Sequence, residues 1–177
     1  MTLTISVGED INDFNAIIEI PMNGGEVKYE YNKDFRFLSV DRFIPTVMRY
    51  PCNYGFVPNT LAEDGDPLDV LVMTPVPLQP GTLIRVRAVG LMRMEDEAGE
   101  DSKILTFPLA KVCREYESIQ SIKDVSPVLL DIIAHFFEHY KDLEPTTKWA
   151  KVKGWDNKDE AEKVFQGSIR RFEKANG

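Results

Sequence analysis

The stretch Asp64-Gly65-Asp66-Pro67-Leu68-Asp69-Val70-Leu71-Val72 carries the strongest structural signal in the sequence. Gly65 can adopt the positive φ of a tight turn, and Pro67 fixes its own φ near about −65°. The largely apolar run over residues 68–72 indicates a buried strand. We therefore expect the three aspartates to lie on a stiff turn and at the start of a strand.

The three carboxylates of this stretch are close enough in sequence to repel one another. They stay ionised together only beside compensating cations, and their oxygen atoms suit Mg²⁺, Mn²⁺ and Ca²⁺. A plain surface turn is the simpler alternative, because Asp-Gly is a common turn dipeptide. An EF-hand calcium loop is excluded, because its sixth and twelfth positions require Gly and Glu but here hold Asp69 and Pro75.

Composition predicts one globular domain over residues 1–177, because 43% of the residues are hydrophobic and 28% are charged. The formal net charge of −8 argues against a nucleic-acid or anionic-membrane partner. We find no apolar run of membrane-spanning length and no basic-then-apolar leader at the N-terminus. Cys52 and Cys113 match neither a disulfide framework nor a zinc motif, so we expect a cytoplasmic protein with reduced thiols.

Alternating apolar and polar residues, or largely apolar runs, predict strands in the first part of the chain. The expected strands cover residues 16–20, 27–31, 35–43, 68–72, 83–94 and 104–109. The alternation places Lys28 and Glu30 on one face of their strand, and Glu19 opposite three apolar side chains. Other segments are expected to be irregular (1–15), an aromatic loop (50–56), an acidic turn (95–101) and a basic strand or loop (148–155).

Helical signals come late in the chain. Ser126 followed by Pro127 is typical of a helix start, and apolar residues then recur at helical spacing as far as Tyr140. Asn157 with Glu160 resembles a capping box at the start of a closing amphipathic helix. Many strands followed by two main helices indicate an α+β domain built on a small antiparallel sheet or barrel.

The segment His135-Phe136-Phe137-Glu138-His139 offers a rival motif, because it matches the H-x-x-E-H pattern of inverted zinc peptidases. Its two histidines would lie one turn apart on one helix face. The sequence holds two histidines, so a third protein ligand would have to be a carboxylate. Because the chain looks too short for a peptide groove, we favour surface or subunit-contact histidines.

Several further polar residues are candidates to join the aspartates in one site. Carboxylates would gather Mg²⁺ ions, while lysine, arginine and tyrosine side chains would bind an anion that the metals also touch. A small polyphosphate fits, because it is rich in oxygen and its transfer depends mainly on charge neutralisation. These candidates are Glu19, Glu30, Asp96, Asp101, Lys28, Arg42, Lys103, Lys141, Tyr50, Tyr54 and Tyr140.

At these residues the chain resembles the family I soluble inorganic pyrophosphatases of the compact bacterial type, whose signature is Asp-Gly-Asp-Pro-x-Asp. The resemblance runs essentially from end to end. Besides residues 64–70, it covers Glu19, 28–30, 41–42, 50–55, 95–103 and 135–141. A signature with this many spaced companions is a specific match.

The resemblance implies a five-stranded barrel of the oligonucleotide/oligosaccharide-binding (OB) type, with two main α-helices packed against it. It implies hydrolysis of diphosphate to two orthophosphates by metal-activated water, with several Mg²⁺ ions per site and Mn²⁺ or Zn²⁺ as possible substitutes. It also implies a homohexamer, in which His135 and His139 contact a neighbouring subunit.

The resemblance also implies roles for individual residues. Asp66 is implied as the general base. Metal ligands are implied at Asp64, Asp69, Asp96 and Asp101, with Glu30 beside a further metal. Phosphate contacts are implied for Lys28, Arg42, Tyr54, Tyr140 and Lys141, and supporting roles for Glu19, Tyr50 and Lys103.

A non-enzymatic alternative stays open, namely a barrel-type binding module whose acidic loops hold a structural cation. This alternative predicts thermal stabilisation by Ca²⁺ without hydrolysis. For a nucleic-acid-binding module, the basic and aromatic groove is not evident in the sequence, and the net charge disfavours it.

Overall fold

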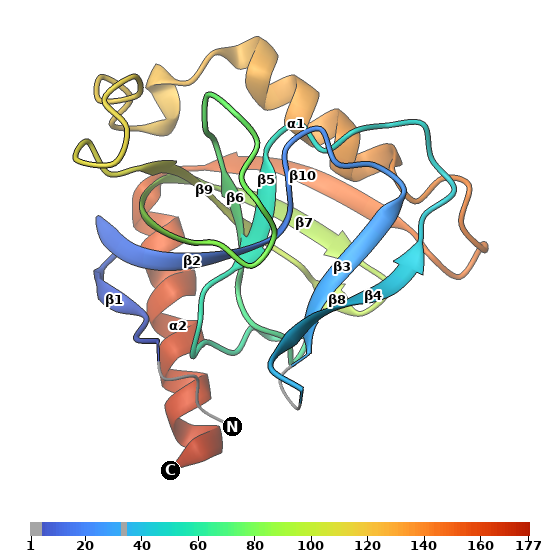
Figure 1. Cartoon of the computed structure of the whole chain (residues 1–177), viewed down its shortest axis with the longest axis horizontal. Helices are drawn as coiled ribbons and strands as arrows, with labels where there is room; N and C mark the ends of the chain where they lie inside the picture. The colour runs from blue at the N-terminus through green and yellow to red at the C-terminus, as the bar shows by residue number, and fades with distance from the viewer. Residues whose placement is uncertain (1–4, 33–34) are drawn as a thin grey trace.

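Five strands of the main sheet close into a ring (Figure 1). The computed structural model describes residues 5–32 and 35–177. In order, the ring contains β2 (Asp13–Ile20), β5 (Asn53–Phe56), β6 (Asp69–Val72), β9 (Lys103–Pro108) and β7 (Leu83–Asp96), and β7 pairs again with β2. β6 and β9 are parallel, and the other neighbours are antiparallel. The expected α+β fold with a five-stranded barrel is therefore confirmed.

β7 is long enough to serve several partners. Its first residues pair with β2, its last residues pair with β10 (Ala150–Asp156), and β9 lies along its middle. The short strands β1 (Gly8–Asp10) and β8 (Gly99–Glu100) extend the sheet beside β2 and β7. A Cβ atom at Gly90 would lie 2.8 Å from the Asp156 carbonyl oxygen, so the close approach of β10 requires glycine there.

Both faces of β6 are buried. Val70 and Val72 belong to an apolar cluster that includes Phe165, whereas Leu71 belongs to a second cluster that includes Phe136. The side chains of Val70, Leu71 and Val72 are fully buried. A strand that is covered on both faces needs apolar residues without alternation, which is the pattern that the sequence showed here.

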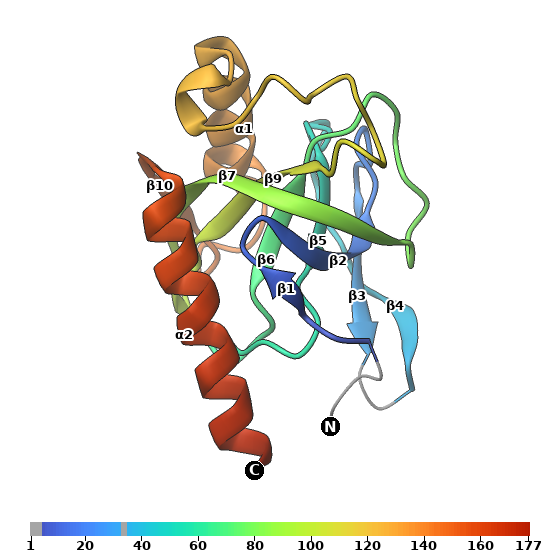
Figure 2. The same ribbon diagram turned by 90° about the vertical axis from the view of Figure 1, so that its left-hand side faces the viewer.

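Two main helices, α1 (Pro127–His139) and α2 (Lys158–Asn176), pack against the barrel, and α2 runs along its outside (Figure 2). Phe165 of α2 packs against Phe14 of β2, with ring centroids 4.9 Å apart. A 3₁₀ turn, η1 (Ile122–Asp124), precedes α1. In the part of the chain that the structure describes, no helix combines the length and the apolar composition needed to cross a membrane.

The helix starts agree only partly with the capping signals. The Asn157 side chain accepts a hydrogen bond from the Glu160 N–H, as expected for an N-cap. The Glu160 carboxylate instead pairs with Arg93, at 3.1 Å from its Nη2. The Ser126 side chain makes no capping hydrogen bond, although Pro127 does open α1.

The strands β3 (Val27–Asn32) and β4 (Phe37–Phe43) form a separate two-stranded sheet beside the barrel (Figure 1). Lys28 lies opposite Arg42 in this hairpin. An ion pair joins Lys28 to Glu30, so both side chains share one face of β3, as the alternation predicted. The hairpin therefore presents two cations and a carboxylate together.

Three segments differ from the expectations. Residues 53–56 form β5 where an aromatic loop was expected. A Cβ atom at Gly55 would lie 1.9 Å from the Ile17 carbonyl oxygen, so this strand needs a residue of low strand propensity. Segment 1–15, expected to be irregular, contains β1 and the start of β2, although residues 1–4 lie outside the described residues. The expected acidic turn over 95–101 contains the end of β7 and β8.

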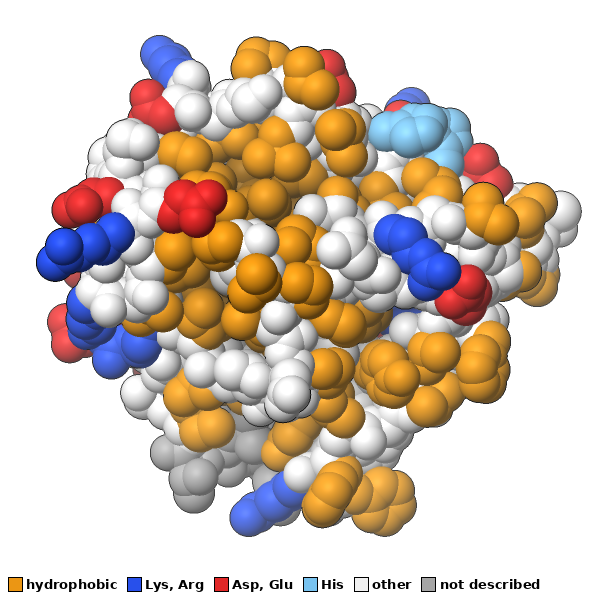
Figure 3. Space-filling view, turned by 45° about the horizontal axis from the view of Figure 1, so that its top comes forward, with side chains coloured by type: hydrophobic (Ala, Val, Ile, Leu, Met, Phe, Trp, Pro, Cys, Tyr) orange, Lys and Arg blue, Asp and Glu red, His pale blue; other side chains and the backbone are white. Residues whose placement is uncertain are grey.

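Apolar side chains cover broad areas of one face of the molecule (Figure 3). Phe35, Phe37 and Phe43 are each 73–74% exposed in or beside the β3–β4 hairpin. Val128 and Ile132 are also exposed on α1. Exposed apolar areas of this kind are typical of protein interaction surfaces.

Candidate active site

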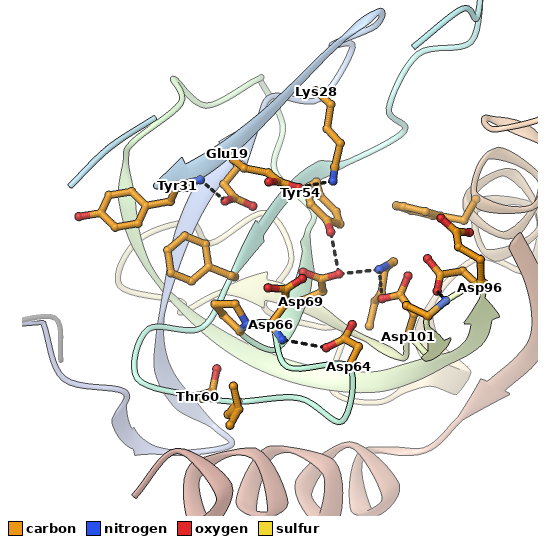
Figure 4. A pocket seen from close by; sticks show the side chains of 18 of the residues that line it. Glu19, Lys28, Tyr31, Tyr54, Thr60, Asp64, Asp66, Asp69, Asp96 and Asp101 are labelled. Carbon is orange, nitrogen blue, oxygen red and sulfur yellow. Dashed lines mark hydrogen bonds and ion pairs between the residues drawn. The ribbon is translucent and has the colours of Figure 1, made fainter. Parts of the chain in front are cut away.

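A pocket of about 400 Å³ lies between the β3–β4 hairpin, the barrel and the C-terminal part of α2 (Figure 4). All fourteen site residues expected from the sequence line it. They are Glu19, Lys28, Glu30, Arg42, Tyr50, Tyr54, Asp64, Asp66, Asp69, Asp96, Asp101, Lys103, Tyr140 and Lys141. The tertiary structure thus brings these residues together, while their individual roles stay predictions.

The turn that carries Asp64 and Asp66 is tight. The Asp64 carboxylate accepts a hydrogen bond from the Asp66 N–H at 3.0 Å, and the Asp66 carbonyl accepts one from the Ala62 N–H at 2.7 Å. Gly65 has φ of 95°, which favours glycine as expected. The Thr60 hydroxyl accepts from the Leu68 N–H at 2.9 Å and closes the loop at its base. The turn is therefore held by its own polar groups.

Lys103 lies among the acidic groups of the pocket. Its Nζ donates to Asp69 Oδ2 and to Asp101 Oδ1, both at 2.6 Å, and its side chain is 2% exposed. Burial by itself would lower the pKa of Lys103, but the charges of Asp101 and Asp69 raise this pKa above its ordinary value. Burial in turn raises the pKa of the Asp101 carboxyl. One buried ammonium group thus compensates two carboxylates.

Tyrosine hydroxyls form part of the same wall. Tyr54 Oη donates to Asp69 Oδ2 at 2.6 Å. Burial raises the pKa of Tyr54 and of Tyr140 well above the ordinary value, so both phenols stay protonated and can donate hydrogen bonds. The buried Tyr50 ring packs against Tyr54, Tyr140 and Phe136 and supports this wall.

Lys141 pairs with a second set of carboxylates in the pocket, Asp96 and Glu97. Its Nζ donates to Asp96 Oδ2 at 2.8 Å and to Glu97 Oε2 at 3.3 Å. Burial would raise the pKa of Glu97, but hydrogen bonds from Lys148 and the Trp149 N–H help to lower it to about 2. Glu97 also lines the pocket. Sequence reasoning placed Glu97 in the acidic turn without giving it a role.

Arg42 is held by two carboxylates. Its Nε and Nη2 donate to Glu144 Oε2 and Oε1 at 2.8 and 3.0 Å, and its Nη1 donates to Asp41 Oδ2 at 2.6 Å. The bonds to Glu144 are the main reason that the pKa of Arg42 is raised. Sequence reasoning missed Glu144, because it lies 102 positions from Arg42 and leaves no local signal.

Glu19 fixes the far end of the β3–β4 hairpin. Its Oε1 accepts a hydrogen bond from the Tyr31 N–H at 2.7 Å. Burial raises the pKa of Glu19 to about 8, which favours the neutral form of its carboxyl. Figure 4 shows Glu19 and Lys28 on one side of Asp66 and Asp69, with Asp96 and Asp101 on another.

The pocket contains the donor atoms that a hard divalent cation requires, because carboxylates outnumber lysines and arginines along its lining. Within the described residues, no group of three or more His, Cys, Asp or Glu side chains has an arrangement that could hold a metal ion. The Lys103 ammonium group pairs with Asp69 and Asp101, and the Lys141 ammonium group pairs with Asp96. The donor set fits divalent cations, and these lysine pairs compensate its charge.

The two histidines lie elsewhere. Their rings pack against each other on α1 with centroids 4.5 Å apart, and His139 Nδ1 lies 2.9 Å from Asp142 Oδ2. Neither His135 nor His139 is among the described residues that line the pocket. The rival zinc-peptidase interpretation therefore gains no support from the pocket.

Comparison with known proteins identifies the chain. The family model described as inorganic pyrophosphatase matches residues 16–173. The solved structure of an inorganic pyrophosphatase from Coxiella burnetii is 71% identical, covers 95% of this chain and 99% of its own, and superposes with a TM-score of 0.93.

Curated relatives agree along almost their whole length. An inorganic pyrophosphatase of Buchnera aphidicola is 52% identical over 176 residues, which are 98% of this chain and 100% of the relative. One of Escherichia coli K12 is 50% identical over 170 residues, 96% of each chain. The chain belongs to the inorganic pyrophosphatase family and hydrolyses diphosphate to two orthophosphates.

Proposed function

We propose that this pyrophosphatase uses Mg²⁺, held by Asp64, Asp69, Asp96 and Asp101 with Glu30 beside a further ion. The observation that carries this proposal is the convergence of these carboxylates, from three separate stretches of the chain, on one pocket. Bound divalent ions supply a water nucleophile at neutral pH, because they lower the pKa of bound water from about 15.7 toward about 7. We expect Mn²⁺ or Zn²⁺ to substitute for Mg²⁺.

Asp66 is the proposed general base. Its backbone is fixed on both sides, by the bond from its N–H to Asp64 and by the bond from the Ala62 N–H to its carbonyl. Its carboxylate lines the pocket beside Asp69, where it can accept the proton that the attacking water loses. The water oxygen then bonds to one phosphorus atom, and the bridging P–O bond breaks.

Lys28, Arg42, Lys141, Tyr54 and Tyr140 are the proposed phosphate contacts. The lysines and the arginine carry positive charge, and the two buried phenols donate hydrogen bonds. These groups are held in place before substrate binds, so they stabilise charge on the leaving phosphate without reorganising.

The remaining expected residues support these contacts. Lys103 holds Asp69 and Asp101 at a common ammonium group, Tyr50 packs behind the phenols, and Glu19 binds the backbone of β3 through Tyr31. We propose that these three residues act through the groups they hold.

We also propose that residues 1–177 act as one domain with an OB-type barrel, in a homohexamer in the cytoplasm. The exposed phenylalanines of the hairpin and the exposed apolar residues of α1 support self-association. Two free cysteines support a reducing compartment. Light scattering on a sizing column tests the hexamer, and a monomeric mass at micromolar concentration would contradict it.

The metal proposal is tested by phosphate release from diphosphate. Protein stripped with EDTA should release no phosphate, and added Mg²⁺ should restore release. Ca²⁺ serves as a comparison, because the binding-module alternative predicts thermal stabilisation by Ca²⁺ with no hydrolysis in any metal. Full release by stripped protein without added metal would contradict the proposal.

A further inference from the structure

We propose that Glu144 is a positioning residue for diphosphate hydrolysis, which acts by holding the Arg42 guanidinium at the phosphate-binding wall. This inference rests on the proposed contact between Arg42 and phosphate. Glu144 is not among the described residues that line the pocket, and its side chain is 5% exposed. It therefore acts through Arg42 and makes no contact with substrate.

The geometry of the pair restricts how Arg42 can move. Two parallel bonds, from Nε and Nη2 to the two oxygens of Glu144, fix the plane of the guanidinium as well as its distance. A third bond joins Nη1 to Asp41. Among the described residues, these bonds use three of the five N–H donors of an arginine, which leaves two for phosphate oxygens.

Glu144 is itself fixed to a second proposed phosphate contact. Its N–H donates to the Lys141 carbonyl at 2.9 Å, in the turn that follows α1. The Lys141 ammonium group reaches Asp96 across the pocket at 2.8 Å. Glu144 thereby sets the position of Arg42, on β4, relative to Lys141, which follows α1.

This link matters because the β3–β4 hairpin forms its own sheet, separate from the barrel. The pairing of Glu19 with the Tyr31 N–H ties β3 to the barrel strand β2. The pairing of Glu144 with Arg42 ties β4 to the segment after α1. A displacement of about 1 Å in a group that contacts the substrate can lower the reaction rate up to about a hundredfold.

A competing role for Glu144 predicts the opposite sign. If the carboxylate mainly competes with phosphate for Arg42, then its removal strengthens anion binding. If it mainly orients Arg42, then its removal weakens binding and catalysis. The two roles therefore differ in the direction of the change in KM.

The experiment compares Glu144→Ala and Glu144→Gln with the control Glu162→Ala, an exposed carboxylate on α2. We expect Glu144→Ala to raise KM for diphosphate and to lower kcat/KM about tenfold, with Glu144→Gln intermediate. The shift of Tm by Mg²⁺ should stay unchanged, because the metal-binding carboxylates are not disturbed. Glu162→Ala should behave as the unmodified protein.

The same substitutions are then made in an Arg42→Ala background, where Glu144→Ala should change kcat/KM by less than about twofold. Loss of similar size in both backgrounds would overturn the inference, as would an unchanged or lower KM in Glu144→Ala. If Arg42→Ala itself retains full activity, the phosphate contact proposed for Arg42 fails and this inference fails with it. An impaired Arg42→Ala beside a normal Glu144→Ala would overturn the positioning role alone.

Discussion

Lys103 Nζ lies 2.6 Å from Asp101 Oδ1, and the two side chains are only 2% and 15% exposed. The same ammonium group lies 2.6 Å from Asp69 Oδ2. This lysine therefore compensates two carboxylates that lie closely enough to repel each other. Substitution of Lys103 should show how much of this charge compensation metal ions can provide.

We predict that Lys103→Met destabilises the metal-free protein by about 3–5 kcal/mol, because buried carboxylates lose their cation. Added Mg²⁺ should reduce the difference in unfolding free energy between Lys103→Met and the unmodified protein. Urea denaturation in EDTA and in Mg²⁺ measures both effects. Lys153→Met is the matched control, since its ion pair with Glu95 is exposed and should contribute about 0–1 kcal/mol. Equal stability of Lys103→Met and the unmodified protein in EDTA would rule out this account.

Asp66→Asn should lower kcat about a hundred- to ten-thousandfold, because asparagine cannot accept the proton of the attacking water. The shift of Tm by Mg²⁺ should persist, since Asp66 is not a proposed metal ligand. Phosphate release and a thermal melt in Mg²⁺ measure the two properties separately. Full activity of the variant would reject Asp66 as the base.

Arg171 of α2 holds the segment that leads into the turn carrying Asp64 and Asp66. Its Nε donates to the Leu61 carbonyl at 2.9 Å, and the Leu61 N–H donates to the Ser168 carbonyl at 3.0 Å. Leu61 is three positions before Asp64, so Arg171→Ala should shift the turn and lower kcat about three- to tenfold. Arg170→Ala, at an exposed neighbouring position, is the control. Identical rates for the two variants would show that the contact does not set the turn.

Asn53 should govern stability and not catalysis. Its side chain is fully buried, accepts from the Met22 and Leu78 N–H groups, and donates to the Val72 carbonyl and the Thr74 hydroxyl. Asn53→Leu leaves these buried groups without partners and should lower the free energy of unfolding by about 2–4 kcal/mol. Urea denaturation measures the loss of stability, and the KM of the folded variant for diphosphate shows whether catalysis is affected. A large rise in KM at unchanged stability would contradict it.

Mg²⁺ should stabilise the folded protein as well as activate the enzyme. At a hundredfold excess over Kd, each bound ion should add about 2.7 kcal/mol to the free energy of unfolding. Asp101→Asn should reduce this gain, whereas Asp131→Asn, at an exposed position on α1, should not. Denaturant titrations with and without Mg²⁺ measure the gain. An undiminished gain in Asp101→Asn would remove Asp101 from the proposed ligands.

Local signals predicted the elements whose own residues determine them. The tight turn at Gly65, the continuous apolar strand β6 and the helix start at Pro127 all appear as expected, because each depends on backbone preference or on local burial. β5 was missed, because Asn53 and Gly55 are poor strand formers in isolation. Neighbouring strands select them, Asn53 for its hydrogen bonds and Gly55 for its close contact with Ile17.

The sequence by itself determined the chemistry of this protein, because the types and order of its carboxylates, cations and phenols can be read from the chain. Only the tertiary structure decided which of them meet. Lys103 with Asp69, and Arg42 with Glu144, are pairs whose partners come from distant parts of the chain. The physical reason is that a closed barrel brings distant segments to one pocket, and spacing along the chain carries no record of that approach.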